Sequence, residues 1–431
     1  MITKLSVNNF RNLKNITIQP KLITLLIGSN GSGKSGIFHS LLVVKQTLDS
    51  ASPRELIFSG KIVNLGSRKE TVFQHEENHP IEIEFKSTFA APKLNNTSET
   101  TIGEMSYKVI SRNSSIEFEQ KLKIDELEVL YNSLTNKPKA IINGNDINFA
   151  HYGRSGIFGF SAGFNDPHLR IYDMYISSDF VRDALGVYLL HVPVPRGFTE
   201  FKSNVPPRKF EYLTSEFGVE ALTRMLLGAA SYDIEFVDKI STAMEELFGK
   251  RIRMAPIEQG MGEIVYDSQQ HGIKGTIDFY DKNGRHYAAN TGFGMNQILF
   301  LFHKVIDSPK GSTIMIEEPE ISLHPVAQRK LMEILIHIAK RHNKQLIITS
   351  HSEHVAFALF RALEKGQLNA DELAVYAFNQ EKDALNTIVS EIKDRQGSLK
   401  EFLGNDTSMI LEYIDAFGKM SEYIETGVIK N

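Results

Sequence analysis

One octapeptide near the start of the chain constrains its fold more than any other segment. Gly28 to Ser35, with the sequence GSNGSGKS, matches the phosphate-loop pattern G-x-x-x-x-G-K-[ST] in full. The residues before it, Leu22 to Ile27, form a nearly continuous apolar run, which is typical of a buried parallel strand. The residues after it repeat apolar side chains at helical spacing. The sequence therefore predicts an α/β fold in which a strand, a phosphate-binding loop and a helix follow one another.

The chemistry of such a loop assigns a role to each residue type. Glycines let successive backbone N–H groups point at one phosphate, and the helix N-terminus adds partial positive charge. Lys34 would bring a mobile charge to the β- and γ-phosphates, and the Ser35 hydroxyl would hold Mg²⁺. A Gly-Ser loop that merely caps a helix is the alternative, which the full motif in this context disfavours. The candidate nucleotide-binding residues of the loop are Gly28, Ser29, Asn30, Gly31, Ser32, Gly33, Lys34, Ser35 and Gly36.

A second apolar strand, from Thr313 to Ile316, ends in the two acids Glu317 and Glu318. We expect this strand beside the phosphate-loop strand, because ligands of such sheets bind beyond the carboxyl ends of the strands. Successive side chains alternate, so the two acids should have different tasks. Glu317 would approach Mg²⁺ through water, and Glu318 would polarise the water that attacks the γ-phosphate. A solvated acidic strand end is the alternative.

A third buried strand runs from Leu346 to Ser350 and leads to His351. A lone histidine is more often structural than catalytic, but this one is expected at the same sheet edge as the other two motifs. Neutral His351 would hydrogen-bond the γ-phosphate or the attacking water. We therefore name Lys34, Glu318 and His351 as the catalytic candidates, whereas His354 is expected to be a helix residue without chemistry.

Composition excludes several classes of protein. The chain has 431 residues, of which 42% are hydrophobic and 23% charged, a balance typical of a globular protein. The absence of cysteine excludes disulfides and thiolate metal sites. A net charge of -4 disfavours a generally basic nucleic-acid coat. No apolar run approaches the roughly 18–20 residues that span a bilayer, and no signal peptide is evident, so we expect a cytoplasmic protein without membrane contact.

The middle of the chain has a different character. Short alternating segments over residues 81–122 predict antiparallel strands, and apolar spacing over residues 123–135 predicts a helix. Residues 151–164 read as a loop with apolar anchors. Further helices are predicted over residues 211–227 and 233–248.

We divide the chain into three parts. Residues 1–90 form a lobe with the phosphate loop, residues 91–289 a mixed strand and helix insertion, and residues 290–431 a second α/β lobe. The last lobe is predicted to end in a helical tail over residues 398–431.

The order of these motifs resembles a known family. A phosphate loop, then the EEPE strand end at 317–320, then the TSHS strand end at 349–352, is similar to ABC-type ATPases of the SMC/RecF/OLD group, often called AAA15-like. The resemblance covers residues 1–90 and 290–385 and implies an ABC-type ATPase head that uses ATP and Mg²⁺. The opening N-F-R segment resembles the start of that group, which implies that Arg11 approaches the nucleotide.

Three further motifs follow from this resemblance. Gln74 lies where the family has its Q-loop, a contact to Mg²⁺ and water. The stretch with Thr291, Gly292 and Gly294 looks like a degenerate signature motif, which meets the γ-phosphate bound by the other protomer. Thr291 departs from the serine of the transporter signature, and a glycine-capped helix start is the alternative. Residues 322–325, of sequence SLHP, resemble the dimer-facing loop.

The function implied is that of an ATPase that dimerises around ATP, as a homodimer or a larger even-numbered assembly. We favour a sensor or regulator of a separate effector, such as a nuclease, in bacterial anti-phage defence. The chain after His351 is too short for the Toprim nuclease domain of OLD proteins. The alternatives are a RecF-like repair ATPase that binds DNA directly, and a scaffold in which ATP is structural. A transporter ATPase is the least favoured.

DNA is a possible partner because the predicted insertion is locally basic. Phosphates can be held by such a patch, although a solvated face with core aromatics is an equally good reading. The basic residues concerned are Lys202, Arg208, Lys209, Arg251 and Arg253.

Overall fold

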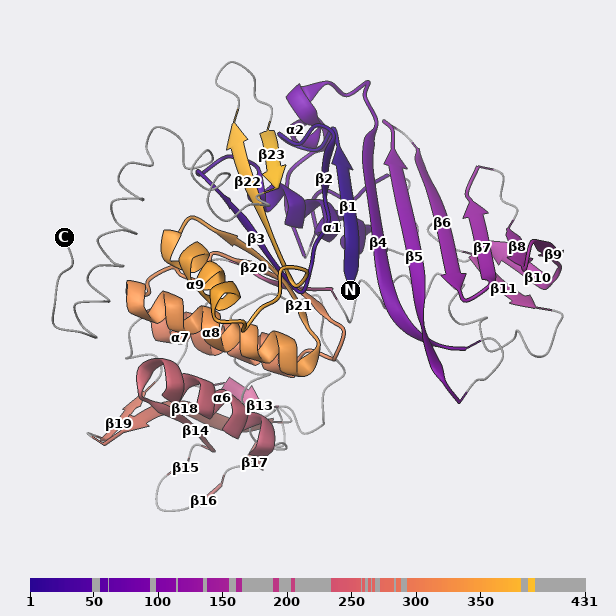
Figure 1. Ribbon diagram of the computed structural model, residues 1–431. Helices are drawn as coiled ribbons and strands as arrows, with labels where there is room; N and C mark the ends of the chain where they lie inside the picture. Colours follow the sequence, from indigo (N-terminus) through magenta and orange to yellow (C-terminus); the bar gives the residue numbers. More distant parts are fainter. Residues whose placement is uncertain are drawn as a thin grey trace.

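The computed structural model (Figure 1) shows a mixed α/β protein built on two large sheets. The structure describes residues 1–48, 55–60, 62–93, 98–113, 115–134, 138–154, 160–164, 189–193, 203–205, 234–256, 258–259, 263–264, 266–267, 272–282, 284–287, 293–380 and 387–391. The predicted helix at 211–227 and the predicted helical tail at 398–431 lie outside these residues.

The central sheet carries the three sequence motifs. Its order is β12-β20-β21-β3-β22-β23, all parallel except β23, which is antiparallel to β22. The strands are β12 (Leu189–Val192), β20 (Thr313–Glu317), β21 (Gln345–Ser350), β3 (Ile23–Gly28), β22 (Leu373–Gln380) and β23 (Thr387–Glu391). The strands predicted for the three motifs are confirmed.

One detail of the expected topology is wrong. The carboxylate strand β20 does not lie beside the phosphate-loop strand β3, because the histidine strand β21 is inserted between them. Helix α8 (Pro325–His342) connects β20 to β21, and the two strands pair side by side, as is usual for a parallel crossover unit. All three strands still run in the same direction, so their carboxyl ends share one edge of the sheet.

Helices and a second sheet cover both faces of the central sheet. Alternate residues of β3 show this division: Leu25 packs into one apolar core and Leu26 into the other. One core contains α1 and the second sheet, and the other contains α6, α7, α8 and α9 (Figure 1). The helices are α1 (Lys34–Leu48), α6 (Ile234–Phe248), α7 (Phe293–Asp307), α8 (Pro325–His342) and α9 (Glu353–Glu364), with the short α2 (Arg68–Thr71) and the 3₁₀ turn η1 (Phe73–His75).

The second sheet is antiparallel throughout, with the order β2-β1-β4-β5-β6-β7-β8-β9. This confirms the antiparallel strands predicted within residues 81–122. The division into three parts stays a prediction, but β4 crosses the proposed boundary at residue 90. The strands are β1 (Ile2–Asn8), β2 (Ile16–Ile18), β4 (Ile81–Pro92), β5 (Thr100–Ser111), β6 (Ile116–Ile124), β7 (Leu127–Asn132), β8 (Lys139–Ile142) and β9 (Asn145–Ile147).

Two predictions in this region are wrong. Residues 123–135 do not form a helix: β6 ends at Ile124, the chain turns at Asp125 with φ of 50°, and β7 follows. Apolar side chains at positions 124, 127, 130 and 134 fit a helical repeat, but positions 127, 129 and 131 are the ones that β7 buries. Residues 151–164 contain a hairpin of β10 (Phe149–Arg154) and β11 (Phe160–Phe164) in place of a loop.

A smaller set of strands lies beside α6 (Figure 1). These are β13 (Ser203–Val205), β14 (Arg251–Pro256), β17 (Tyr266–Asp267), β18 (Gly272–Asp281) and β19 (Gly284–Tyr287), with the separate pair β15 (Glu258–Gln259) and β16 (Glu263–Ile264). The predicted helix at 233–248 is confirmed as α6. Among the described residues, no helix has both the length and the apolar character needed to cross a membrane.

Candidate functional site

The phosphate loop leaves the end of β3 and enters α1, as its sequence predicts. Gly31 and Gly33 have φ of 77° and 100°, which a glycine adopts without strain. Gly28 is required for another reason, since a Cβ there would lie 2.2 Å from the carbonyl oxygen of Phe378 on β22. The sequence of the loop therefore fits both its curvature and its packing against the neighbouring strand.

Contacts from distant segments brace the loop. The Asn12 side chain donates from Nδ2 to the Gly31 carbonyl at 2.9 Å, and the Thr387 hydroxyl donates to the Ser32 carbonyl at 2.9 Å. The backbone N–H of Thr387 also donates to the Asn12 carbonyl, at 3.0 Å. Thr387 is 2% exposed and its bond to Ser32 is buried, whereas the bond from Asn12 to Gly31 is exposed. The loop is thereby held in its curved form from both sides.

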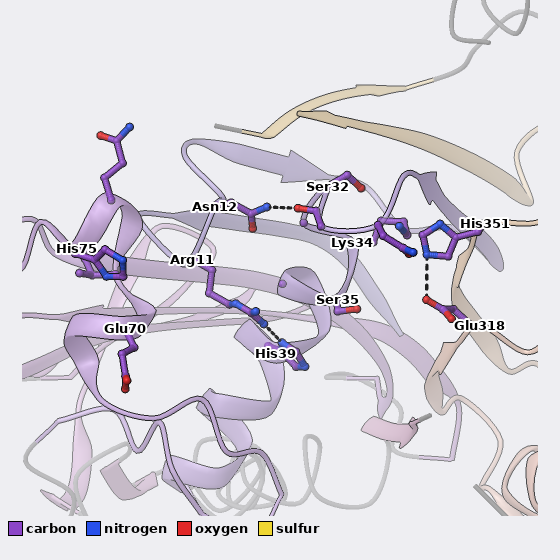
Figure 2. Close-up of a pocket in the computed structure, with 16 residues that line it drawn as sticks. Arg11, Asn12, Ser32, Lys34, Ser35, His39, Glu70, His75, Glu318 and His351 are labelled. Carbon is purple, nitrogen blue, oxygen red and sulfur yellow. Dashed lines mark hydrogen bonds and ion pairs between the residues drawn. The ribbon is translucent and has the colours of Figure 1, made fainter. Parts of the chain in front are cut away.

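The loop faces a cavity of about 510 Å³ (Figure 2). Arg11, Gln74, Glu318 and His351 all line it, so the structure brings these predicted site residues together. Gly28, Ser29, Glu317 and Gly294 are not among the lining residues. The full lining comprises Arg11, Asn12, Asn30, Gly31, Ser32, Gly33, Lys34, Ser35, Gly36, His39, Glu70, Val72, Gln74, His75, Glu318 and His351.

Lys34 is folded back onto its own loop. Its Nζ donates to the carbonyl oxygens of Gly28 and Ser29, both at 2.8 Å. Burial lowers the pKa of Lys34 to about 8, and the nearby carboxylates of Glu318 and Glu320 act in the opposite direction. Lys34 therefore lines the cavity, with its ammonium group near the carboxylates of Glu318 and Glu320.

Glu318 and His351 form a pair across the ends of β20 and β21. His351 Nε2 lies 3.0 Å from Glu318 Oε1, and both side chains are about a third exposed. Glu318 has a positive φ of 41°, a conformation that non-glycine residues rarely adopt. Its backbone N–H donates to the Thr349 carbonyl at 2.9 Å, which holds it there. Figure 2 shows the pair beside Lys34.

Glu317 points to a different neighbour than Glu318, as strand alternation predicts. Its Oε1 lies 3.2 Å from Nε2 of His191 on β12, and His191 is only 7% exposed. Neither Glu317 nor His191 is among the residues that line the cavity, whereas Ser35 and Gln74 are. A hydroxyl, an amide oxygen and a carboxylate are hard oxygen donors that suit Mg²⁺, so this set fits the implied metal.

Arg11 lines the cavity, with its guanidinium against His39 of α1. Arg11 Nη1 lies 2.5 Å from His39 Nδ1 (Figure 2). Burial and, second, the charge of Arg11 lower the pKa of His39 to about 4, so the ring is neutral at pH 7 and accepts from the guanidinium. Burial also lowers the pKa of Arg11, against an opposing effect of Glu317. Arg11 therefore lines the same cavity as the phosphate loop, and His39 holds its guanidinium.

The signature-like segment is described only in part. Thr291 and Gly292 lie outside the described residues, whereas Gly294 lies in the first turn of α7. A Cβ on Gly294 would come within 2.6 Å of the Ser322 carbonyl oxygen. Gly294 thus packs directly on the loop at 322–325.

The basic residues assigned to DNA are also described only in part. Lys202, Arg208 and Lys209 lie outside the described residues, and so does the side chain of Arg253. Arg251 pairs with Asp238 at 2.8 Å and with Glu245 at 3.6 Å.

Sequence reasoning missed several residues of the site. His39 was detectable, because it lies one helical turn after Ser35 on the helix that leaves the phosphate loop. Glu320 was detectable as the last acid of the EEPE tetrapeptide. His191 and Thr387 gave no local signal, because His191 reaches the site through the pairing of β12 with β20, and Thr387 through the pairing of β23 with β22, which in turn pairs with β3.

Together, the braced loop, the cavity and the acid–histidine pair define a phosphate-loop nucleotide-binding protein. A family model described as AAA ATPase domain (AAA_15) matches residues 1–155 and 231–356, which is more than half of the chain. The protein therefore belongs to the AAA_15 family of ATPase domains, within the SMC/RecF/OLD-like group.

Individual proteins resemble this chain either over a short segment or at low sequence identity. An OLD nuclease of Thermus scotoductus is 34% identical over 87 residues, which are 20% of this chain and 16% of the nuclease. An SMC head domain from Thermotoga maritima aligns over 91% of this chain and 99% of its own, with 11% identity and a TM-score of 0.39. An SMC head domain from Pyrococcus furiosus, bound to the C-terminal domain of ScpA, covers 96% of this chain and 99% of its own, with 11% identity and a TM-score of 0.43.

Proposed function

We propose that this protein binds ATP with Mg²⁺ and hydrolyses it to ADP and phosphate. One observation carries the proposal: the Glu318–His351 pair lies next to Lys34 at the open end of a braced phosphate loop. A negative group that can polarise water, a histidine and a phosphate-binding lysine thus face one cavity. This is the arrangement that phosphoryl transfer to water requires.

Each residue has a distinct task in the proposed reaction. Lys34 exchanges its contacts with the Gly28 and Ser29 carbonyls for phosphate oxygens, and the loop N–H groups hold the remaining oxygens. Glu318 orients the attacking water and accepts its proton, while His351 hydrogen-bonds the γ-phosphate or that water.

The metal would be held at the start of α1. We propose that Ser35 and Gln74 supply oxygen atoms directly and that Glu317 acts through water. When bound, Mg²⁺ neutralises phosphate charge. His191 keeps the Glu317 carboxylate in place, as outer partners of metal ligands commonly do.

We also propose that two copies of the chain enclose ATP between them. The contact of Gly294 with the Ser322 carbonyl supports this, because it joins the signature-like helix start to the loop at 322–325. In the proposed dimer, Thr291, Gly292 and Gly294 of one copy approach the γ-phosphate held by its partner. A homodimer, or a larger even-numbered assembly, would form with ATP and separate after hydrolysis.

The proposed cycle is a switch, and we propose that it regulates a separate effector in bacterial anti-phage defence. The partial match to an OLD nuclease favours a nuclease as the effector class. Direct DNA binding, as in a RecF-like repair ATPase, is the competing role. It predicts that duplex DNA alone stimulates turnover.

Steady-state phosphate release, with and without duplex DNA, tests the central proposal. Lys34→Ala should weaken ATP binding about 10–100-fold, because a charged hydrogen-bond donor to phosphate is lost. Glu318→Gln serves as the blank, since it should bind ATP without turning it over. Wild-type ATP affinity in Lys34→Ala, or wild-type turnover in Glu318→Gln, would contradict the assignment.

Light scattering tests the dimer. Glu318→Gln with ATP should double its mass, while Lys34→Ala with ATP should not. Gly294→Asp should remain monomeric, but its Cβ also meets Ser322 within the same chain, so its melting temperature is measured alongside. An ATP-dependent dimer of a folded Gly294→Asp variant would contradict the proposal that the signature-like segment contacts the partner's nucleotide.

A further inference from the structure

Glu320, the last acid of the EEPE tetrapeptide, is a buried carboxylate. It is 8% exposed, and its Oε1 accepts hydrogen bonds from the Ser350 hydroxyl at 2.6 Å and from the His351 backbone N–H at 3.0 Å. Among the described residues, its other oxygen, Oε2, is buried without a hydrogen-bond partner. Burial of a carboxyl group with an unsatisfied oxygen is costly, so a structural contact alone is a poor explanation for it.

The two acids of this strand end hold the same histidine at two points. Glu318 contacts the ring of His351 at Nε2, and Glu320 binds its backbone N–H. The turn between them is tight: the Ile321 N–H donates to the Glu318 carbonyl at 3.2 Å. Loss of the Glu320 contact would free the backbone of His351 and thereby move its ring relative to Glu318.

The Glu320 carboxylate also begins a chain of hydrogen bonds that leads to the loop at 322–325. The Ser350 hydroxyl that donates to Glu320 accepts from the Ser352 N–H at 2.9 Å. The Ser352 hydroxyl donates to Gln328 Oε1 at 2.5 Å, and Gln328 Nε2 donates to the Leu323 carbonyl at 2.9 Å. The chain therefore connects the histidine strand end to the loop at 322–325.

We infer that Glu320 is a positioning residue, which holds His351 against Glu318 and connects that pair to the loop at 322–325. The inference rests on the proposed ATPase function. Because Glu320 acts through His351 and Glu318, its loss should lower turnover without removing the phosphate-loop contacts that bind ATP. A residue that only joins two strand ends would instead affect thermal stability.

Three variants separate these roles. Glu320→Ala removes the acceptor, Glu320→Gln keeps an acceptor oxygen but removes the charge, and Glu364→Ala is a matched control on exposed surface. We expect kcat to fall at least tenfold in Glu320→Ala, with the affinity for a fluorescent ATP analogue changed less than threefold. Glu320→Gln should recover most of the lost turnover, and the control should behave as wild type. Wild-type kcat in a folded Glu320→Ala variant would overturn the inference.

A spectroscopic readout keeps the test independent of turnover. The ¹⁵N signals of the His351 ring, assigned by their loss in His351→Ala, report its hydrogen bond to Glu318 in nucleotide-free protein. We expect them to shift in Glu320→Ala; unchanged signals would overturn the inference. If Glu320→Ala does not fold, Glu320→Gln and Ser350→Ala are compared in the same way. Absence of wild-type turnover would refute the proposed ATPase while leaving this measurement able to judge Glu320.

Discussion

The pKa of Lys34, lowered by burial to about 8, makes a quantitative prediction about ATP binding. Only the protonated lysine offers a positive charge to phosphate, so the affinity should fall as pH rises through the pKa of the free protein. Between pH 7 and pH 9, the protonated fraction drops from about 0.9 to about 0.1. The dissociation constant for ATP should therefore rise about tenfold, equivalent to about 1.4 kcal/mol.

The assay is equilibrium binding of a non-hydrolysable fluorescent ATP analogue, at constant Mg²⁺ and ionic strength, from pH 6.5 to 9.5. Lys34→Arg is the control, because a guanidinium stays charged over this range and its affinity should not follow the same curve. Glu318→Gln removes one of the negative charges that oppose the lowering, so the midpoint should move to lower pH. An affinity that stays constant within twofold in the wild type would refute the reasoning.

Further variants test separate contacts of the site. Glu318→Gln should lower phosphate release about 10²–10⁴-fold while ATP binding is kept, as expected for loss of a general base; turnover within tenfold of wild type would rule out that role. His191→Ala removes the partner of Glu317 and should raise the Mg²⁺ concentration for half-maximal turnover about 10–100-fold, seen in a metal titration. Gly28→Ala places a Cβ 2.2 Å from the Phe378 carbonyl, so thermal unfolding should show a loss of about 1–3 kcal/mol.

Much of the site was predictable because its main parts are local motifs. The phosphate loop, the two acids after Ile316 and the histidine after Ser350 each follow a buried parallel strand. Carboxyl ends of parallel strands meet at one edge, so three separate strand ends predict one cavity. This prediction of a shared sheet edge depends only on the three strands being parallel. The wrong prediction of which strand lies beside β3 therefore does not affect it.

The remaining parts depend on pairing that local patterns do not encode. β12 is a four-residue strand, and only its register with β20, where His191 pairs with Met315, brings His191 near Glu317. The helix predicted at 123–135 failed because short apolar runs fit both periods, and pairing of Ile124 with Leu127 decided for a hairpin. A distant strand therefore places His191, whereas at residues 123–135 the pairing of two adjacent strands overrides the helical spacing.

The brace on the phosphate loop has a consequence for how the protein matures. Thr387 follows Ser32 by 355 positions, so at roughly 5–20 residues per second the ribosome delivers the brace about 20–70 s after the loop itself. Until then the loop lacks the contact that fixes the Ser32 carbonyl. Contacts of such large sequence separation form late in folding. The capacity to bind ATP should therefore arise only once β23 has docked, which makes nucleotide occupancy a marker of that docking.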